Sequence, residues 1–219
     1  MVQSSTLKFL KELQKHNDRT WFEAHRKAYE DAKENILEFT AEMIKAIARF
    51  DKPIGMLEAK NCTFRINRDV RFSKNKDPYK NNMASYFNKD GKKGIGAGYY
   101  MHIEPGKSFA AGGIWAPEAP VLAGIRQEID YNFTEWQKIV TARSFTKTFT
   151  DGISGETLTR PPKGYGEDNP AIDFIKMKSF IVRRPFTDAE VQDPGFVKNA
   201  ARIFAEMKPL VDFINTSLH

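Results

Sequence analysis

The chain has 219 residues, of which 41% are hydrophobic and 12% aromatic, and its formal net charge is +6. These values are typical of a folded globular protein with one large core, and they argue against a disordered chain. A single cysteine excludes an internal disulfide, and no stretch approaches the roughly 20 apolar residues that cross a bilayer. The N-terminal residues show no secretory signal. We therefore expect a cytoplasmic protein without a membrane segment.

Two helices are expected at the N-terminal end. Residues 5–16 place three leucines on one stripe, with Ser4 or Ser5 as the cap. Asp18 has the position of an N-cap for a long helix over 19–49, whose apolar residues recur at helical spacing.

The centre of the chain is predicted to form strands. Residues 62–67 alternate apolar and polar side chains, which indicates a half-buried strand with Arg65 and Asn67 on its polar face. Pro105-Gly106 is a turn signal, so an antiparallel hairpin is expected around it. The further strands predicted in this region cover 83–88, 98–104 and 107–115.

The C-terminal part is predicted to be mainly helical, with one more strand over 179–184. Thr187 and Glu190 have the spacing of a capping box, and Asp193-Pro194 resembles a cap followed by proline at the first helical position. The helices expected here cover 118–130, a segment capped by Asn132, a turn at 171–176 and a final helix kinked at Pro209, with an irregular stretch over 151–170. Together the elements predict one α+β domain over residues 1–219, in which a central, mainly antiparallel sheet packs against N- and C-terminal helices.

The basic excess of the protein is concentrated in one stretch. Residues 65–93 contain nine Lys or Arg and three Asp, whereas the remaining chain has as many acidic as basic residues. Crowded like charges repel, so a folded chain that gathers them usually has an anion or a carboxylate network beside them. We expect a basic pocket at the polar face of the sheet, and its anion-binding candidates are Arg65, Arg68, Arg71, Lys76 and Lys80. The alternative is an internal network, in which Asp69 and nearby glutamates satisfy the arginines and brace the segment.

Three residues are candidates for proton transfer or orientation, each with a structural alternative. His102 lies in a predicted strand whose alternation places Tyr100, His102 and Glu104 on one face, so it is either a general base or a hydrogen-bonded sheet histidine. Asp69 lies between two arginines, which would keep its carboxylate ionised for an orienting role or a salt bridge. Tyr79 either donates a hydrogen bond to a bound oxyanion or packs its ring on the sheet.

Other classes of site have weaker support. Cys62 falls on the apolar side of its predicted strand and reads as an inert core thiol. The four histidines and one cysteine show no metal-ligand spacing, so no metal site is assigned to them. A carboxylate-bound Mg²⁺ stays open, and the cofactor is unknown from the sequence. Gly94–Gly98 precedes a predicted strand and not a helix, which disfavours a nucleotide-binding loop.

The central segment resembles a bacterial family called domain of unknown function 2461. The family signature R-x-x-R-D-x-R-F-x-x-[DN]-K-x-x-Y is matched by Arg65, Arg68, Asp69, Arg71, Phe72, Asn75, Lys76 and Tyr79. The segments 17–22, 98–102 and 161–165 also resemble the family. The resemblance therefore covers nearly the whole chain. One difference is Asn169-Pro170, where His-Pro is common, and this argues against a catalytic histidine there. The resemblance implies no particular reaction.

Three functions therefore remain open. The first is binding of a small phosphate- or carboxylate-bearing ligand, with or without catalysis. The second is nucleic-acid binding, with Tyr79, Tyr86 or Phe87 as stacking partners if exposed, and with a row of lysines comprising Lys74, Lys76, Lys80, Lys89, Lys92 and Lys93. The third is a protein-interaction scaffold in which the motif is architectural. The sequence gives no oligomeric state.

Overall fold

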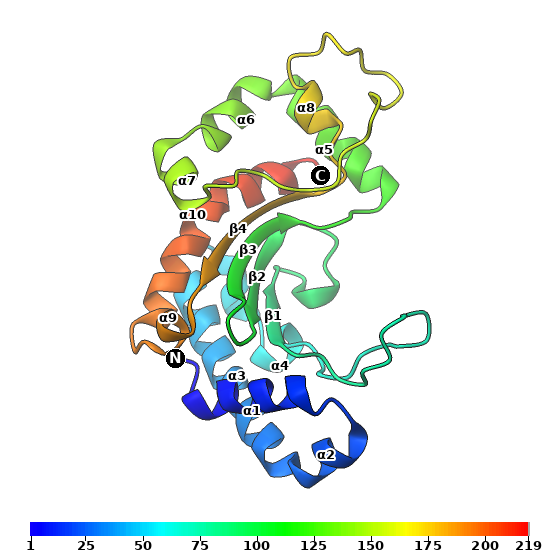
Figure 1. Cartoon of the computed structure of the whole chain (residues 1–219). Helices are drawn as coiled ribbons and strands as arrows, with labels where there is room; N and C mark the ends of the chain where they lie inside the picture. The colour runs from blue at the N-terminus through cyan, green and yellow to red at the C-terminus, as the bar shows by residue number, and fades with distance from the viewer. Residues whose placement is uncertain (219) are drawn as a thin grey trace.

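Four antiparallel strands form the centre of the molecule in a computed structural model that describes residues 1–218 (Figure 1). The strands are β1 (Met83–Phe87), β2 (Gly98–Ile103), β3 (Ser108–Ile114) and β4 (Phe180–Phe186), and neighbours in the sheet are neighbours in the sequence. The predicted hairpin between β2 and β3 is confirmed, with Tyr100 opposite Ala111 and His102 opposite Phe109. Each predicted strand from residue 83 onward agrees with the structure to within two residues.

Two long helices cover one face of the sheet. They are α3 (Arg26–Ile47) and α10 (Phe196–Thr216), which pack against the same layer of strands (Figure 1). Alternate side chains of a strand point to opposite faces, so every second strand residue faces these helices. The strand residues that face the helices are buried. Gly112 of β3 lies against Met207 of α10, and a side chain at this position would require the methionine to shift. The core of the protein therefore lies between this face and the two helices.

Shorter helices surround this layer and complete the α+β fold that was predicted. The N-terminal pair is α1 (Ser4–Lys15) and α2 (Arg19–Ala24), and the helix α4 (Ala59–Cys62) precedes β1. A second group lies beside the C-terminal end of α10 and comprises α5 (Ala119–Tyr131), α6 (Phe133–Val140), α7 (Arg143–Thr148) and α8 (Ile172–Ile175), with α9 (Asp188–Gln192) following β4. Two 3₁₀ turns cover Lys52–Met56 and Gly91–Lys93. None of the helices in residues 1–218 is long and apolar enough to cross a membrane.

The helix predicted over 19–49 is two helices. Asp18 caps the first as predicted, since its carboxylate accepts a hydrogen bond from the Trp21 amide at 2.9 Å. The chain then leaves the helical conformation at His25, whose ring stacks on Trp21 with centroids 4.0 Å apart and whose Nδ1 bonds to the Trp21 carbonyl. These contacts accompany the break, which falls at a residue that has no helix-breaking signal of its own.

Several predicted boundaries are wrong. The strand over 62–67 is absent, because Cys62 ends α4 and only Thr63 and Asn67 form isolated bridges, to Ser85 and Tyr79. Two predicted caps also fail, because α1 follows Gln3 and α10 starts after Gly195. Asn132 occupies the N-cap position of α6 as predicted, but its side chain donates to Glu128 and does not cap the helix. In contrast, the capping box of Thr187 and Glu190 is confirmed. The final helix continues through Pro209.

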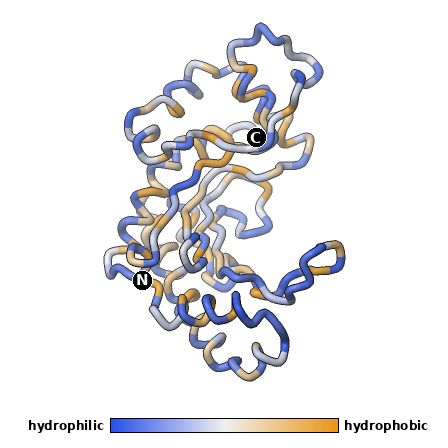
Figure 2. Tube along the Cα trace, viewed as in Figure 1, coloured by the Kyte–Doolittle hydropathy of each residue, from blue (hydrophilic) through white to orange (hydrophobic). Residues whose placement is uncertain are grey.

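Residues 66–80 form a hairpin that projects from the body of the molecule (Figure 1). It is closed at its base by hydrogen bonds from the Lys80 amide to the Ile66 carbonyl and from the Arg68 amide to the Pro78 carbonyl. Figure 2 shows that this hairpin is mostly hydrophilic, with an apolar stretch near its tip. The face of the sheet opposite α3 and α10, here called the open face, lies on the same side of the molecule as the hairpin (Figure 1).

Candidate functional site

The open face carries a row of three polar side chains, two from β2 and one from the residue that follows it. Tyr100, His102 and Glu104 alternate with Tyr99, Met101 and Ile103, which are buried toward the helices. Tyr99, for example, packs on Phe204 of α10 with ring centroids 5.4 Å apart. The predicted alternation is therefore confirmed, and it places the three polar groups together outside the core.

These three side chains form a continuous chain of hydrogen bonds. The Tyr100 hydroxyl lies 3.1 Å from Nδ1 of His102, and Nε2 of His102 lies 2.9 Å from Oε2 of Glu104. A carboxylate only accepts hydrogen bonds, so Nε2 of a neutral His102 carries the proton and Nδ1 is left as an acceptor. The Tyr100 hydroxyl then donates to Nδ1. This is the order of groups found in a relay, in which a carboxylate orients a histidine that can take a proton from a hydroxyl.

The end of the relay is fixed by contacts from other elements. The second oxygen of Glu104 accepts a hydrogen bond from Gln14 of α1 at 3.4 Å, and Lys107 lies 3.9 Å from it. The His102 ring stacks on Phe109 of β3, with centroids 4.6 Å apart. Because both ring nitrogens and one ring face are engaged, the orientation of His102 is determined by its surroundings.

The surroundings keep His102 neutral. Burial lowers the pKa of the imidazole below its usual value, and the charge of Arg183 acts in the same direction, while the hydrogen bond to Glu104 opposes them. Burial and the nearby Glu104 charge raise the pKa of Tyr100 to about 12. Near pH 7 the relay therefore contains a neutral phenol that donates its proton in a hydrogen bond to Nδ1 of a neutral imidazole.

Arg183 of β4 is a site residue that the sequence reasoning missed. Its guanidinium carbon lies 3.8 Å from the centre of the Phe109 ring. Phe109 is on β3, which lies between β4 and the strand of His102. No carboxylate in residues 1–218 lies within 4.0 Å of its nitrogens, and the side chain is exposed. The signal that was available is the strand predicted over 179–184, in which Arg183 alternates with buried Val182.

On the other side of the relay lies the base of the hairpin. Phe64 is 40% exposed and meets the Tyr100 ring edge to face at 6.3 Å. The Lys80 ammonium lies 5.6 Å from the Phe64 ring centre and donates to the Arg65 carbonyl at 2.9 Å. Burial and the Arg65 charge lower the pKa of Lys80. The chain of contacts thus runs from Lys80 through Phe64 and Tyr100 to His102.

The other predicted anion-binding residues lie within the hairpin and bond to it. The Arg68 guanidinium donates to the Asp77 carbonyl and the Ser73 hydroxyl, both at 3.2 Å, and the Lys76 ammonium donates to the Val70 carbonyl at 3.0 Å. These contacts hold the two sides of the hairpin together. They correspond to the bracing alternative, with backbone carbonyls in place of the expected carboxylates.

Asp69 and Arg71 pair with each other at an exposed position. The guanidinium donates twice to the carboxylate, at 2.6 and 3.0 Å, and these bonds lower the pKa of Asp69. This ion pair corresponds to the salt-bridge alternative for Asp69. The described contacts of Asp69 do not include His102.

Tyr79 occupies a packing position. It is only 6% exposed and stacks on Phe22 of α2 with ring centroids 3.9 Å apart. The Asn17 amide accepts a hydrogen bond from the Tyr79 N–H at 3.1 Å and donates one to its carbonyl at 3.0 Å. The ring and the backbone of Tyr79 therefore anchor the hairpin to the α1–α2 connection, which corresponds to the structural alternative.

The aromatic residues proposed to stack on nucleic-acid bases are not exposed. Tyr79 and Phe87 are buried, and the Tyr86 hydroxyl is hydrogen-bonded to the Gly96 carbonyl at 3.0 Å in a largely buried position. Burial raises the pKa of Tyr86 to about 12. A nucleic acid could not reach these three rings without a change in the fold.

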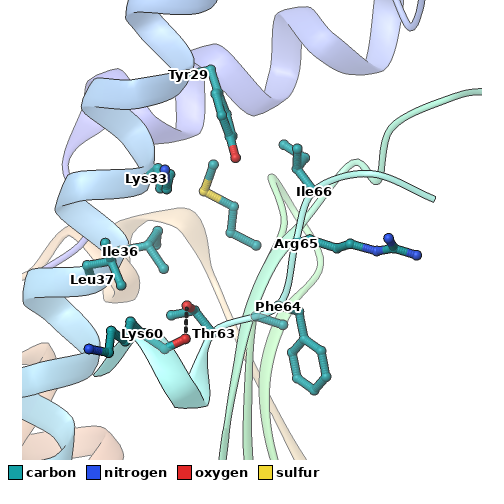
Figure 3. Close-up of a pocket in the computed structure, with 11 residues that line it drawn as sticks. Tyr29, Lys33, Ile36, Leu37, Lys60, Thr63, Phe64, Arg65 and Ile66 are labelled. Carbon is teal, nitrogen blue, oxygen red and sulfur yellow. Dashed lines mark hydrogen bonds between the residues drawn. The ribbon is translucent and has the colours of Figure 1, made fainter. Parts of the chain in front are cut away.

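A cavity of about 250 Å³ lies between α3, α4 and the segment that leads into the hairpin (Figure 3). Its apolar lining includes Ile36, Leu37 and Ile66, and the Arg65 and Phe64 side chains point away from it (Figure 3). Two lysines border the cavity, and both are paired with glutamates. Lys33 lies 3.2 Å from Glu30, and Lys60 lies 2.9 Å from Glu58. The anion-binding candidates do not converge in this cavity.

The remaining predicted groups carry no further site. Cys62 is buried, and burial raises the pKa of its thiol to about 11, so it is an unreactive core residue as expected. Within residues 1–218, no three side chains of His, Cys, Asp or Glu are placed to share a metal ion.

The comparisons with known proteins identify one family. The family described as conserved hypothetical protein (DUF2461) matches residues 5–213 of the chain. No curated protein and no solved structure matches the chain significantly.

Proposed function

The chain belongs to the DUF2461 family of conserved hypothetical proteins, and we propose that it binds a small ligand with a phosphate or carboxylate group on the open face of the sheet. The observation that carries this proposal is the relay of Tyr100, His102 and Glu104, which lies between Arg183 and the hairpin base with Arg65 and Lys80. In this proposal the anion contacts Arg183 beside His102.

The charges of this region favour an anion. Arg183 and Arg65 have no carboxylate within ion-pair distance in the described part of the chain, and Glu104 is occupied by His102 and Lys107. A guanidinium presents its donors in a planar fork that matches two oxygens of a phosphate or carboxylate. Arg183 is also held over the Phe109 ring, which fixes its position without using its hydrogen-bond donors.

The spacing of the strands indicates the size of the ligand. Neighbouring strands are about 4.8 Å apart, so the hairpin-leading segment beside β1 and the strand β4 are separated by roughly 19 Å. One phosphate cannot contact both Arg183 and Arg65 across this distance. A ligand that contacts only Arg183 and His102 needs one anionic group, whereas a ligand that also reaches Lys80 and Arg65 needs a longer body or a second anionic group.

The relay adds a proton-transfer function to the site. A ligand group that gives its proton to the Tyr100 oxygen would drive the hydroxyl proton of Tyr100 to Nδ1 of His102. The imidazolium that forms would be stabilised by Glu104 at 2.9 Å. The proton moves from the ligand to His102 and no net charge is created, so the step balances without a cofactor.

The proposal is tested by measuring the pKa of His102 by NMR of its ring nitrogens, with and without inorganic phosphate. Phosphate beside Arg183 should raise the pKa, because it offsets the positive charge that lowers it. Arg183→Gln should itself raise the pKa and should abolish the further rise with phosphate.

Arg160→Gln provides a control, since this arginine lies exposed in the irregular stretch between α7 and α8. It should leave the phosphate response of His102 unchanged. A His102 pKa that does not respond to phosphate, or that responds equally in Arg183→Gln, would contradict the proposed site.

A further inference from the structure

The tip of the 66–80 hairpin has a feature that the small-anion site does not use. Phe72 is 97% exposed, the highest value among the large apolar side chains of residues 1–218. An apolar ring held fully in water at the end of a projecting hairpin has no role in the stability of the fold.

The side chains around this ring are positively charged, and two of the three have no acidic partner in residues 1–218. The Arg71 guanidinium lies 5.9 Å from the Phe72 ring centre, and Lys74 and Lys76 are exposed on the same tip. Apart from Arg71, which pairs with Asp69, none of these cations has a carboxylate within 4.0 Å in the described chain. A partner for this tip must therefore supply negative charge and a flat surface for the ring.

The hairpin is internally braced, so the tip is presented in a fixed form. The Arg68 and Lys76 side chains donate to carbonyl and hydroxyl oxygens on the opposite side of the hairpin, and Asn75 bonds to both the amide and the carboxylate of Asp77. Preorganisation of this kind reduces the entropy that binding would cost.

We propose that the tip of this hairpin binds single-stranded nucleic acid, with a base stacked on Phe72 and phosphates on Arg71, Lys74 and Lys76. A ring between cations is the arrangement by which single strands are bound without sequence preference. Attachment to an anionic membrane would instead need a broader apolar face or a second anchor, and the tip offers one ring. This surface is separate from Arg183 and the relay, so either proposal can fail without the other.

The test is fluorescence anisotropy with a labelled single-stranded oligothymidylate of about 12 nucleotides, a length within the usual site size. Phe72→Ala should weaken binding by roughly 5- to 150-fold, the range expected from the loss of one stacked base. Phe72→Trp should retain binding, and Phe72→Leu should lose it, because leucine is apolar but does not stack. Trp115→Ala is the matched control, since Trp115 is 75% exposed at the end of β3, away from the hairpin.

Salt dependence tests the phosphate contacts. Between about 50 and 200 mM salt, the logarithm of affinity should fall with a slope of about −2, as expected for three phosphates on a single strand. Lys74→Ala should reduce this slope by about 0.7, while Lys163→Ala in the irregular stretch should leave it unchanged.

Three results would overturn the inference. The first is absence of oligonucleotide binding at low salt, and the second is equal affinity of Phe72→Ala and Trp115→Ala for the oligonucleotide. The third is that the protein binds vesicles of phosphatidylcholine and phosphatidylserine but not the oligonucleotide, and that Phe72→Leu retains the vesicle binding. Since the substituted side chains are exposed, a melting temperature equal to that of the unmodified protein would confirm that the variants are folded.

Discussion

The 66–80 hairpin and the open face of the sheet use polar side chains in opposite ways. In the hairpin, Arg68 and Lys76 donate to main-chain carbonyls of the same segment, whereas on the open face Tyr100, His102 and Glu104 bond to one another. The first arrangement stabilises a loop, and the second aligns groups that can exchange a proton. The segment with the highest density of charge in the sequence is therefore not the place where the groups of the proton relay bond to one another.

The largest effect that separates the two regions should come from the anchor of the hairpin. Tyr79→Ala removes the ring stacked on Phe22 and should lower the free energy of unfolding by about 3 kcal/mol, as for other buried aromatic residues. Urea denaturation measures this loss. Tyr79→Phe keeps the ring and should be nearly neutral, so an equally large loss in Tyr79→Phe would instead assign a role to the hydroxyl.

A smaller effect is expected from the brace within the hairpin. Arg68→Ala removes two hydrogen bonds and should destabilise the hairpin by about 1–2 kcal/mol. Faster hydrogen exchange at hairpin amides, with unchanged exchange in β2 and β3, would confirm that the contact is local. Arg68→Lys keeps the charge without the guanidinium fork, and full protection in that variant would argue against the brace.

The smallest effect concerns pH and the open face. The pKa of His102 is lowered in the folded protein, so at pH values between the folded pKa and the ordinary imidazole pKa of about 6.5 the unfolded chain binds more protons. The stability contributed by a neutral His102 is thus complete above about pH 6.5, and it is lost as the pH falls through the folded pKa. Chemical denaturation at a series of pH values should show a shallower decline for His102→Gln than for the unmodified protein. Parallel curves would show that His102 titrates equally in both states.

Local patterns were sufficient for much of this fold. The strands β1 to β3 follow from alternation and a Pro-Gly turn, and the capping box before α9 follows from two side chains three residues apart. The row of Tyr100, His102 and Glu104 was predicted for the same reason, since a strand places every second residue on one face.

Features that depend on distant contacts could not be predicted in this way. Arg183 belongs to the site only because β4 pairs with β3 some seventy residues earlier in the chain. The break at His25 coincides with its stacking against Trp21. Phe64 follows an isolated bridge between Thr63 and Ser85 of β1 and is exposed. Alternation alone cannot distinguish such a segment from a strand.

The bond between Asn17 and Tyr79 has a consequence for how the hairpin can vary. The Asn17 side chain bonds to both the N–H and the carbonyl of Tyr79. It thus makes the pair of hydrogen bonds that a residue of a neighbouring strand would otherwise make. Attachment of this kind does not depend on the residues between the two ends of the hairpin. The hairpin is thus a module that can change in length and composition at its tip while its junction with the body remains the same.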